Sequence, residues 1–340
     1  MGKHDARPEG KKKRHPLLSF IKGLFAVLFT LVAAVLILAV IMIYIFERGP
    51  SPELRDVFVL TVQQSSAAKP LAKLFLSEEE VQQILDNNKA KDDDLNTDTS
   101  LVTITPPDEN TGEDDLIIED VYGATYRGKM MIVKDPSRVY VYTLPSYGGS
   151  QGMRVREMVN AEGAIGGING GGFYDAGGMG NGSAPLGIVI SRGVWRNGNK
   201  GSRYKLIGID NDNKLIIGNY TGYEALNMGI RDALEWGPAL IVNGEPVDVG
   251  TGGGLNPRSA IGQRADGAIL LLVIDGRQPN SMGADYLDRI GIMQNYGAVN
   301  AANLDGGNSS SMVYDGEVIT TPGSLNGERP LPTAILVEAR

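Results

Sequence analysis

The sequence predicts an α+β fold with a mixed, largely antiparallel sheet core and few helices, preceded by one N-terminal transmembrane helix. Asn243-Gly244 and Asp315-Gly316 are dipeptides that type I′ hairpin turns demand, and each lies between apolar runs. Residues 268–275 are almost continuously apolar, as in a strand covered on both faces. Hairpins at several points, with few and grouped helices, favour α+β over a doubly wound fold.

The N-terminal region divides into a basic tail, residues 1–22, and an uncharged apolar run, residues 23–46. A run of this length crosses the roughly 30 Å hydrocarbon core of a bilayer as a helix. A cleavable signal peptide is the rival interpretation, but its apolar region would be shorter, and no small-residue cleavage site precedes Glu47. The positive-inside rule then predicts a single-pass protein of the cell membrane, with a cytoplasmic N-terminus and an extracellular C-terminal domain.

Residues 47–115 are predicted to form an extracellular membrane-proximal segment and an acidic linker. Ser77 and Glu80 have the spacing of a capping box at the start of a short helix. From residue 86 to residue 115 the composition is acidic and poor in aromatics, which indicates a solvated, self-repelling linker. Two alternatives stay open, namely that residues 101–104 dock as an edge strand and that the acidic run binds Ca²⁺.

The compact domain is predicted to cover residues 116–340. Its elements follow from apolar periodicity and turn residues. Ser281 is the expected cap of its last helix. The expected elements are strands at 139–142, 164–168, 187–194, 268–275 and 333–337, hairpins at 204–218, 238–247 and 312–320, and helices at 154–162 and 284–296.

The residue inventory excludes several kinds of chemistry for the extracellular part. The chain has no cysteine, and its two histidines, His4 and His15, precede the apolar run. Ser-His-Asp and Cys-His catalysis are therefore excluded there, as are zinc sites built on His or Cys. Acid–base groups must be carboxylates, Lys or Tyr. No cofactor is predicted with certainty, and only a hard, oxygen-bound cation such as Ca²⁺ or Mg²⁺ is left open. Without a basic stripe, nucleic acid is not an expected partner.

Four polar constellations lie beside predicted strand ends or turns. Each has an alternative interpretation as an ordinary turn, because Gly, Asn, Asp and Ser are common turn residues. Paired glycines also let a backbone approach a ligand closely. Arg offers phosphate a bidentate fork, while Asp can hold sugar hydroxyls, act as a base or attack an anomeric carbon. The constellations are Asn169 with residues 170–173, residues 256–262, Asp275-Gly276-Arg277 with Ser281, and residues 304–311.

These pieces, together with Gly237-Pro238 and Asn243-Gly244, resemble the phosphodiester glycosidase family, some bacterial members of which are described as exopolysaccharide biosynthesis proteins. They occur in the family's order across roughly residues 120–340. Asn308 stands where the family often has a third glycine, and residues 1–115 have no counterpart. The resemblance implies Asp305, Asp275, Arg258 and Arg277 as catalytic residues, with the roles of the two carboxylates undecided. The substrate-binding candidates are Asn169, Gly170, Asn308, Ser309, Ser310, Ser281 and Glu235, the last beside Trp236.

The activity implied by the resemblance is hydrolysis of the bond between a sugar C1 and a phosphodiester oxygen. The expected partners are a sugar-phosphate or polysaccharide substrate in envelope or exopolysaccharide material, and the membrane through the N-terminal helix. Two alternatives are a non-catalytic glycan-binding or polysaccharide assembly module, and a metal-dependent phosphodiesterase that cleaves P–O.

Overall fold

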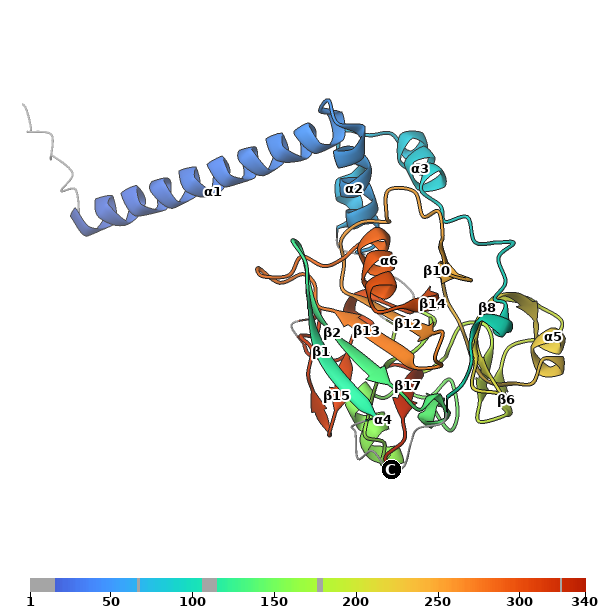
Figure 1. Ribbon diagram of the computed structural model, residues 1–340. Coiled ribbons are helices and arrows are strands. Elements are labelled where there is room, and N and C mark those ends of the chain that lie inside the picture. Colours follow the sequence, from blue (N-terminus) through green and yellow to red (C-terminus); the bar gives the residue numbers. More distant parts are fainter. Residues whose placement is uncertain (1–15, 66–67, 106–114, 176–179, 325) are drawn as a thin grey trace, which may run out of the picture.

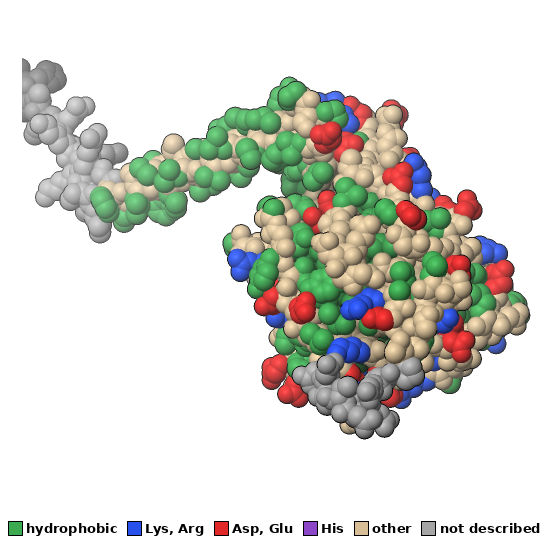
Figure 2. Space-filling model, viewed as in Figure 1, with side chains coloured by type: hydrophobic (Ala, Val, Ile, Leu, Met, Phe, Trp, Pro, Cys, Tyr) green, Lys and Arg blue, Asp and Glu red, His purple; other side chains and the backbone are tan. Residues whose placement is uncertain are grey.

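The computed structural model describes residues 16–65, 68–105, 115–175, 180–324 and 326–340, so most of the predicted basic tail lies outside the described residues. Helix α1 (Pro16–Arg48) projects from the body as one long helix (Figure 1). Hydrophobic side chains cover it (Figure 2). Its segment Phe20–Arg48 has 29 residues, and the most apolar 18-residue stretch within it has a mean hydropathy of 3.2 and is not buried. Length and composition suit a membrane span, although a signal sequence near the N-terminus would have the same properties.

A small helical cluster follows α1 and rests on the domain beside α6 (Figure 1). Its three helices share an apolar core that includes Val59, Leu60 and Ile84. The predicted capping box is confirmed, since Glu80 N–H donates to Ser77 Oγ at 3.1 Å and Ser77 N–H to Glu80 Oε2 at 2.7 Å. The cluster consists of α2 (Pro52–Gln63), the 3₁₀ helix η1 (Lys69–Lys73) and α3 (Glu78–Asn87).

The prediction of a solvated acidic linker is wrong for residues 88–105, which run along the domain surface. Asp92 pairs with Lys205 at 2.5 Å and accepts a bond from Ala239 N–H at 2.9 Å. The alternative, docking of residues 101–104 as an edge strand, holds for the docking and not for the strand. The segment contains a 3₁₀ helix, η2 (Thr99–Leu101), followed by extended chain in which Thr103 N–H donates to Ala265 O at 2.9 Å. The acidic composition of this segment indicated self-repulsion, because Lys205, which neutralises the charge of Asp92, lies far away in the sequence.

Three sheets form the domain, and every pairing among the described strands is antiparallel, which confirms the α+β prediction. All six residues of β13 are buried, as its apolar run predicted. The seven-stranded sheet has the order β1 (Leu116–Tyr122), β2 (Arg127–Val133), β13 (Ile269–Ile274), β12 (Arg258–Arg264), β14 (Ala298–Asn303), β10 (Ala239–Val242), β11 (Glu245–Pro246).

The two other sheets have five strands each. Both predicted I′ dipeptides lie at hairpin turns with positive φ: 57° and 84° at Asn243 and Gly244, and 50° and 75° at Asp315 and Gly316. The strand expected at 187–194 is split by a turn at Arg192-Gly193. One sheet has the order β16 (Glu317–Val318), β15 (Met312–Tyr314), β4 (Gly166–Asn169), β17 (Thr333–Val337), β3 (Val139–Thr143), and the other β6 (Val194–Asn197), β5 (Val189–Ser191), β9 (Ile230–Glu235), β7 (Arg203–Asp210), β8 (Leu215–Thr221).

Side-chain alternation along the strands explains how the sheets share a core. In β3, Val139 and Val141 join the central core, while Tyr140 and Tyr142 pack with helix α4 (Val155–Glu162) on the other face. The third sheet likewise contributes one face to the central core and the other to a cluster with α5 (Gly222–Asn227). The remaining short helices are η3 (Pro136–Arg138) and η5 (Gly307–Ser309).

Helix α6 (Tyr286–Asn295) corrects one prediction, because its N-cap is Asp285 and not Ser281. Asp285 Oδ1 accepts the N–H of Asp288 at 2.8 Å. Ser281 instead closes a turn, since its Oγ donates to Asp275 O at 2.7 Å and accepts from Arg127 N–H at 3.0 Å.

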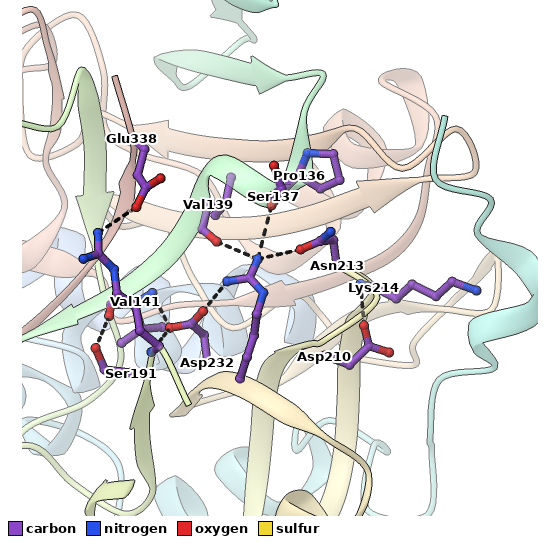
Figure 3. A network of polar contacts seen from close by, with 12 residues as sticks. Pro136, Ser137, Val139, Val141, Ser191, Asp210, Asn213, Lys214, Asp232 and Glu338 are labelled. Carbon is purple, nitrogen blue, oxygen red and sulfur yellow. Dashed lines mark hydrogen bonds and ion pairs between the residues drawn. The ribbon is translucent and has the colours of Figure 1, made fainter. Parts of the chain in front are cut away.

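A buried polar cluster joins β3 to β5 and β9 (Figure 3). Asp232, which is fully buried, accepts bonds at Oδ1 from Val141 N–H at 3.0 Å and Arg192 N–H at 2.9 Å, and its Oδ2 pairs with Arg231. Arg231 also donates to Val139 O and to Asn213 Oδ1, both at 3.0 Å. Each charge in this cluster therefore has partners.

Candidate active site

The antiparallel register of the seven-stranded sheet brings three predicted constellations together. Arg258, the first residue of β12, pairs with Ile274, the last residue of β13. Ala260 pairs with Asn303, the last residue of β14. The polar segments that follow β13 and β14 therefore both lie beside the start of β12.

The fourth constellation, at the end of β4, supports the loop that carries Asp305. Asn169 is fully buried, and its Nδ2 donates to Asp305 O at 2.6 Å. Its Oδ1 accepts from Ser259 Oγ at 2.6 Å, and Asp305 N–H donates to Gly170 O at 3.3 Å. Asn169 and Gly170 thus hold the loop from behind, and neither lines the pocket described next.

A pocket of about 580 Å³ opens where these segments meet. Five of the predicted site residues line it: Asp305, Arg258, Arg277, Asn308 and Ser309. The other lining residues are Gln64, Ser65, Phe173, Asp175, Trp236, Gly237, Asn256, Tyr286, Asn303, Gly306, Gly307 and Arg329.

Two guanidinium groups in this pocket have neutral hydrogen-bond partners within the described parts of the chain. Arg258 is 5 % exposed and donates to the carbonyls of Gly253 and Gly254 at 3.1 and 3.0 Å. Burial lowers the pKa of Arg258, and the nearby charges of Asp285 and Asp305 oppose that shift. Arg277 donates to Asn308 Oδ1 at 2.7 Å and to Asn256 Oδ1 at 3.2 Å. Burial lowers the pKa of Arg277, and the positive charge of Arg258 lowers it further. An anion between them would relieve both effects.

The backbone conformation at Arg277 and at Gly307 sets the position of the Arg277 side chain. Arg277 has a φ of 59°, in the left-handed region that side chains seldom adopt. Gly307 has a φ of 63°, and a Cβ there would lie 3.4 Å from Arg277 Nη2. That distance is an ordinary van der Waals contact, so the left-handed backbone is what favours glycine at position 307.

The pKa of the Asp305 carboxyl group is shifted toward neutral pH by its surroundings. Burial raises its pKa to about 6, against the opposing effects of a bond from Ser309 and the Gly306 N–H at 2.9 Å. The charge of Arg329 lowers the pKa, and that of Asp175 raises it. The group is therefore mostly ionised at neutral pH and becomes protonated in mildly acidic solution.

A second carboxyl group, Asp175, has the opposite tendency. Burial opposes its ionisation, but two bonds from Arg329, at 2.6 and 2.8 Å, and the Gly180 N–H outweigh that effect and lower its pKa. The Arg329 guanidinium also lies 4.6 Å from the centre of the Phe173 ring. Two carboxyl groups with pKa values moved apart are characteristic of acid–base sites.

Tyr286 and Arg289 complete the wall behind Arg258. The Tyr286 ring lies 5.0 Å from the Arg258 guanidinium and 4.5 Å from that of Arg289. Arg289 is fully buried, and burial lowers its pKa to about 9, with a further contribution from Arg258. Its Nη1 bonds to Asn303, whose own Nδ2 donates to Gly237 O at 2.6 Å. Positive charge is therefore concentrated on this side of the pocket.

Four other predicted residues lie outside the pocket wall. Asp275 Oδ1 accepts the N–H of Thr321 at 2.8 Å, and Asp275 O accepts from Ser281, so both residues close a turn behind Arg277. Ser310 is buried. Glu235 lines a neighbouring cavity, and burial raises its pKa.

Sequence reasoning missed Tyr286, Asn303, Arg329, Gln64 and Ser65. Tyr286 and Asn303 look like the ordinary first residue of a helix and last residue of a strand. Arg329 becomes significant only through its contact with Asp175, 154 residues away. Trp236 did stand out, as an aromatic beside Glu235. It packs against Gly172, where a Cβ would overlap the Trp236 ring.

Carboxylates and histidines do not form any group of three that could hold a metal ion within the residues the structure describes. The basic character of the pocket comes instead from side-chain guanidinium groups.

Comparison with known proteins identifies the family and supports the fold. A model of the phosphodiester glycosidase family matches residues 162–338, just over half of the chain. Over 99 residues the chain is 34 % identical to the SPbeta prophage-derived uncharacterized protein YomE of Bacillus subtilis strain 168, a stretch that covers 28 % of this chain and 15 % of that protein. The chain therefore matches only a small part of that relative's length.

A solved structure extends the comparison to the fold. The catalytic domain of zebrafish N-acetylglucosamine-1-phosphodiester alpha-N-acetylglucosaminidase, auto-inhibited by its pro-peptide, superimposes with a TM-score of 0.56 at 21 % identity. The superposition covers 68 % of this chain and 86 % of that one. The chain belongs to the phosphodiester glycosidase family, whose members are hydrolases of phosphodiesters. Family and fold together support a glycosidase-type function.

Proposed function

We propose that the chain is a membrane-anchored, extracellular phosphodiester glycosidase that hydrolyses the bond between a sugar C1 and a phosphodiester oxygen. The observation that carries the proposal is the pair Arg258 and Arg277, which donate hydrogen bonds to neutral acceptors and lie beside the carboxyl group of Asp305. Two guanidinium groups can bind an anion with several oxygens, such as a phosphate. The carboxyl group can then act on the sugar attached to it.

The leaving group explains how this chemistry proceeds without histidine. A phosphate ester departs as a stable anion, so it needs little help from a general acid. Arg258 and Arg277 bind its oxygens and stabilise the charge that develops as the C1–O bond breaks. Asp305, ionised at neutral pH, then serves as base toward water or as nucleophile toward C1.

The other polar groups orient these parts. Asn308 holds Arg277, and Ser309 bonds to Asp305, so both fix the reacting groups from the same short helix, η5. Asp175, held ionised by Arg329, is the proposed acceptor for sugar hydroxyls. Asp275, predicted as catalytic, is proposed instead as a positioning residue, because it closes the turn that sets the backbone of Arg277.

The cellular setting is part of the proposal. The basic tail and α1 support a cytoplasmic N-terminus, with residues 47–340 outside the cell and acting on envelope or exopolysaccharide material. We also propose that the catalytic domain begins near residue 116.

Release of free sugar from an N-acetylglucosamine-1-phosphodiester by the full chain in detergent tests the proposal. We expect Asp305→Asn to lower kcat about 10³-fold, within the range typical of a lost acid–base group or nucleophile. Asp315→Asn, a carboxylate at an exposed hairpin turn, is the matched control and should retain full activity. Each protein is assayed in EDTA and then with Ca²⁺ or Mg²⁺ added.

Three outcomes would contradict the proposal. Full activity in a folded Asp305→Asn protein would exclude that residue as the reacting group. Reaction in ¹⁸O-labelled water distinguishes the bond cleaved, since label in the phosphate instead of the sugar would indicate a P–O phosphodiesterase. Binding without any turnover would indicate a glycan-binding module.

A further inference from the structure

The membrane-proximal cluster forms a wall against the pocket side of the domain. Thr61 Oγ1 accepts the N–H of Leu255 at 3.1 Å, and Asn88 Oδ1 accepts that of Thr251 at 2.8 Å. Gln64, just after α2, bonds to Gly253 O and accepts from Asn256 Nδ2 at 3.1 Å. Asn256 in turn accepts from Arg277, so the cluster is connected to a proposed phosphate-binding arginine.

A second cavity, of about 650 Å³, lies between this cluster and the end of β9. It shares four wall residues with the first pocket, so the two adjoin: Gln64, Trp236, Gly237 and Tyr286. Five aliphatic residues line the rest of it, Leu60, Leu85, Ala90, Leu186 and Pro238. They are joined by Asn88, Lys89, Lys205, Glu235 and two glycines.

The two cavities differ in their charged groups. Lys205 in the second cavity pairs with Asp92 and Asp93, at 2.5 and 2.9 Å, and Lys89 lies 3.8 Å from Asp93. Burial raises the pKa of Glu235 there, so its charged form is less favoured than that of an exposed glutamate. Because its lysines are paired with aspartates, this cavity is a poor binding site for phosphate. Its aliphatic side chains favour a hydrocarbon ligand instead.

We propose that the second cavity binds the hydrocarbon end of a lipid-linked sugar phosphodiester, whose phosphate lies between Arg258 and Arg277. The inference rests on the proposed function, because a phosphodiester has one ester oxygen on the sugar and one on a second alcohol. Hydrolysis adds the hydroxyl of water to C1, breaks the C1–O bond and leaves that oxygen on the phosphate. The products are free sugar and a lipid phosphomonoester, with one proton released to solvent at neutral pH.

The position of the cavity relative to the membrane helix favours a lipid over a soluble glycan. Only residues 49–51 separate α1 from α2, and Leu60 lies eight residues beyond the first residue of α2. At 1.5 Å per helical residue this wall is about 12 Å from the start of α2. A long-chain alcohol can span that distance while the rest of its tail stays in the bilayer.

The test compares two substrates that differ only in the second alcohol, the methyl and decyl esters of N-acetylglucosamine-1-phosphate, with the full chain in lipid nanodiscs. Each buried methylene strengthens binding by about fourfold. We therefore expect kcat/KM for the decyl ester to exceed that for the methyl ester at least tenfold. Leu186→Gln should reduce this ratio severalfold, whereas Leu226→Gln, an exposed leucine on α5 outside both cavities, should not.

Equal kcat/KM values for the two esters would overturn the lipid inference and leave the proposed function intact. A high ratio that Leu186→Gln and Leu60→Gln leave unchanged would also overturn it, because the bilayer itself would then be concentrating the substrate. Failure to cleave either ester would count against the proposed function. The product analogue decyl phosphate then tests the cavity independently, and calorimetric binding no tighter than that of methyl phosphate would overturn it.

Discussion

Two clusters of Arg and Asp in this domain, one buried and one lining a pocket, have opposite organisation. Around Asp232, both carboxylate oxygens have N–H donors and Arg231 has a carboxylate and carbonyl partners, so the cluster is closed and balanced (Figure 3). Around Asp305, the buried Arg258 and the exposed Arg277 have neutral hydrogen-bond partners and face a pocket. Burial raises the pKa of both carboxyl groups, so the shift alone does not distinguish a structural cluster from a reactive one. The unbalanced charge and the adjoining pocket distinguish the reactive cluster from the structural one.

The largest effect we expect is on stability, at the balanced cluster. Asp232→Ala removes the partner of Arg231 and leaves the N–H groups of Val141 and Arg192 buried without an acceptor. We expect the free energy of unfolding to fall by about 3–5 kcal/mol, as when a buried ion pair loses one member. Urea unfolding measures this, with Asp212→Ala at an exposed turn as control. A loss below about 1 kcal/mol would contradict the structural role.

At the unbalanced cluster, Arg277→Ala should affect activity far more than stability. We expect kcat/KM to fall about 100-fold, since a charge-assisted contact to the leaving phosphate is lost. The free energy of unfolding should change by less than about 1 kcal/mol, because lost bonds to Asn308 and Asn256 are offset by relief of repulsion from Arg258.

Steady-state kinetics and urea unfolding of the same Arg277→Ala preparation separate the two effects. Arg264→Ala on β12, which removes an exposed pair with Asp266, is the control. A large loss of stability with unchanged kcat/KM would place Arg277 with the structural cluster.

The smallest effect we expect is a displacement of the pH profile. Asp305 must be ionised to act, and its pKa is about 6, so kcat/KM should rise with pH through that value. The negative charge of Asp175 raises this pKa. Asp175→Asn should therefore move the acidic limb toward lower pH, by up to about one unit. A profile that stays in place, or moves to higher pH, would show that Asp175 does not act on Asp305 electrostatically.

Comparing the two clusters also shows what sequence patterns reveal. The glycine-rich loop at Asp305 and the segment Pro257-Arg258-Ser259 stood out because their residue types are unusual together. Nothing marked Asp232, an ordinary residue within a strand. Conversely, Asp275 and Ser281 carried the same signals as Asp305, and the structure uses them to close a turn.

The sequence by itself determined the local elements. Apolar periodicity defined β13, the I′ dipeptides fixed two hairpins, and Ser77 with Glu80 defined the start of α3, because these depend on residues a few positions apart. The tertiary structure alone decided that Asp92 meets Lys205, that Arg329 meets Asp175, and that Gln64 reaches the pocket. Charge pairing and pocket walls depend on contacts between residues far apart in the chain, and local composition does not specify those contacts.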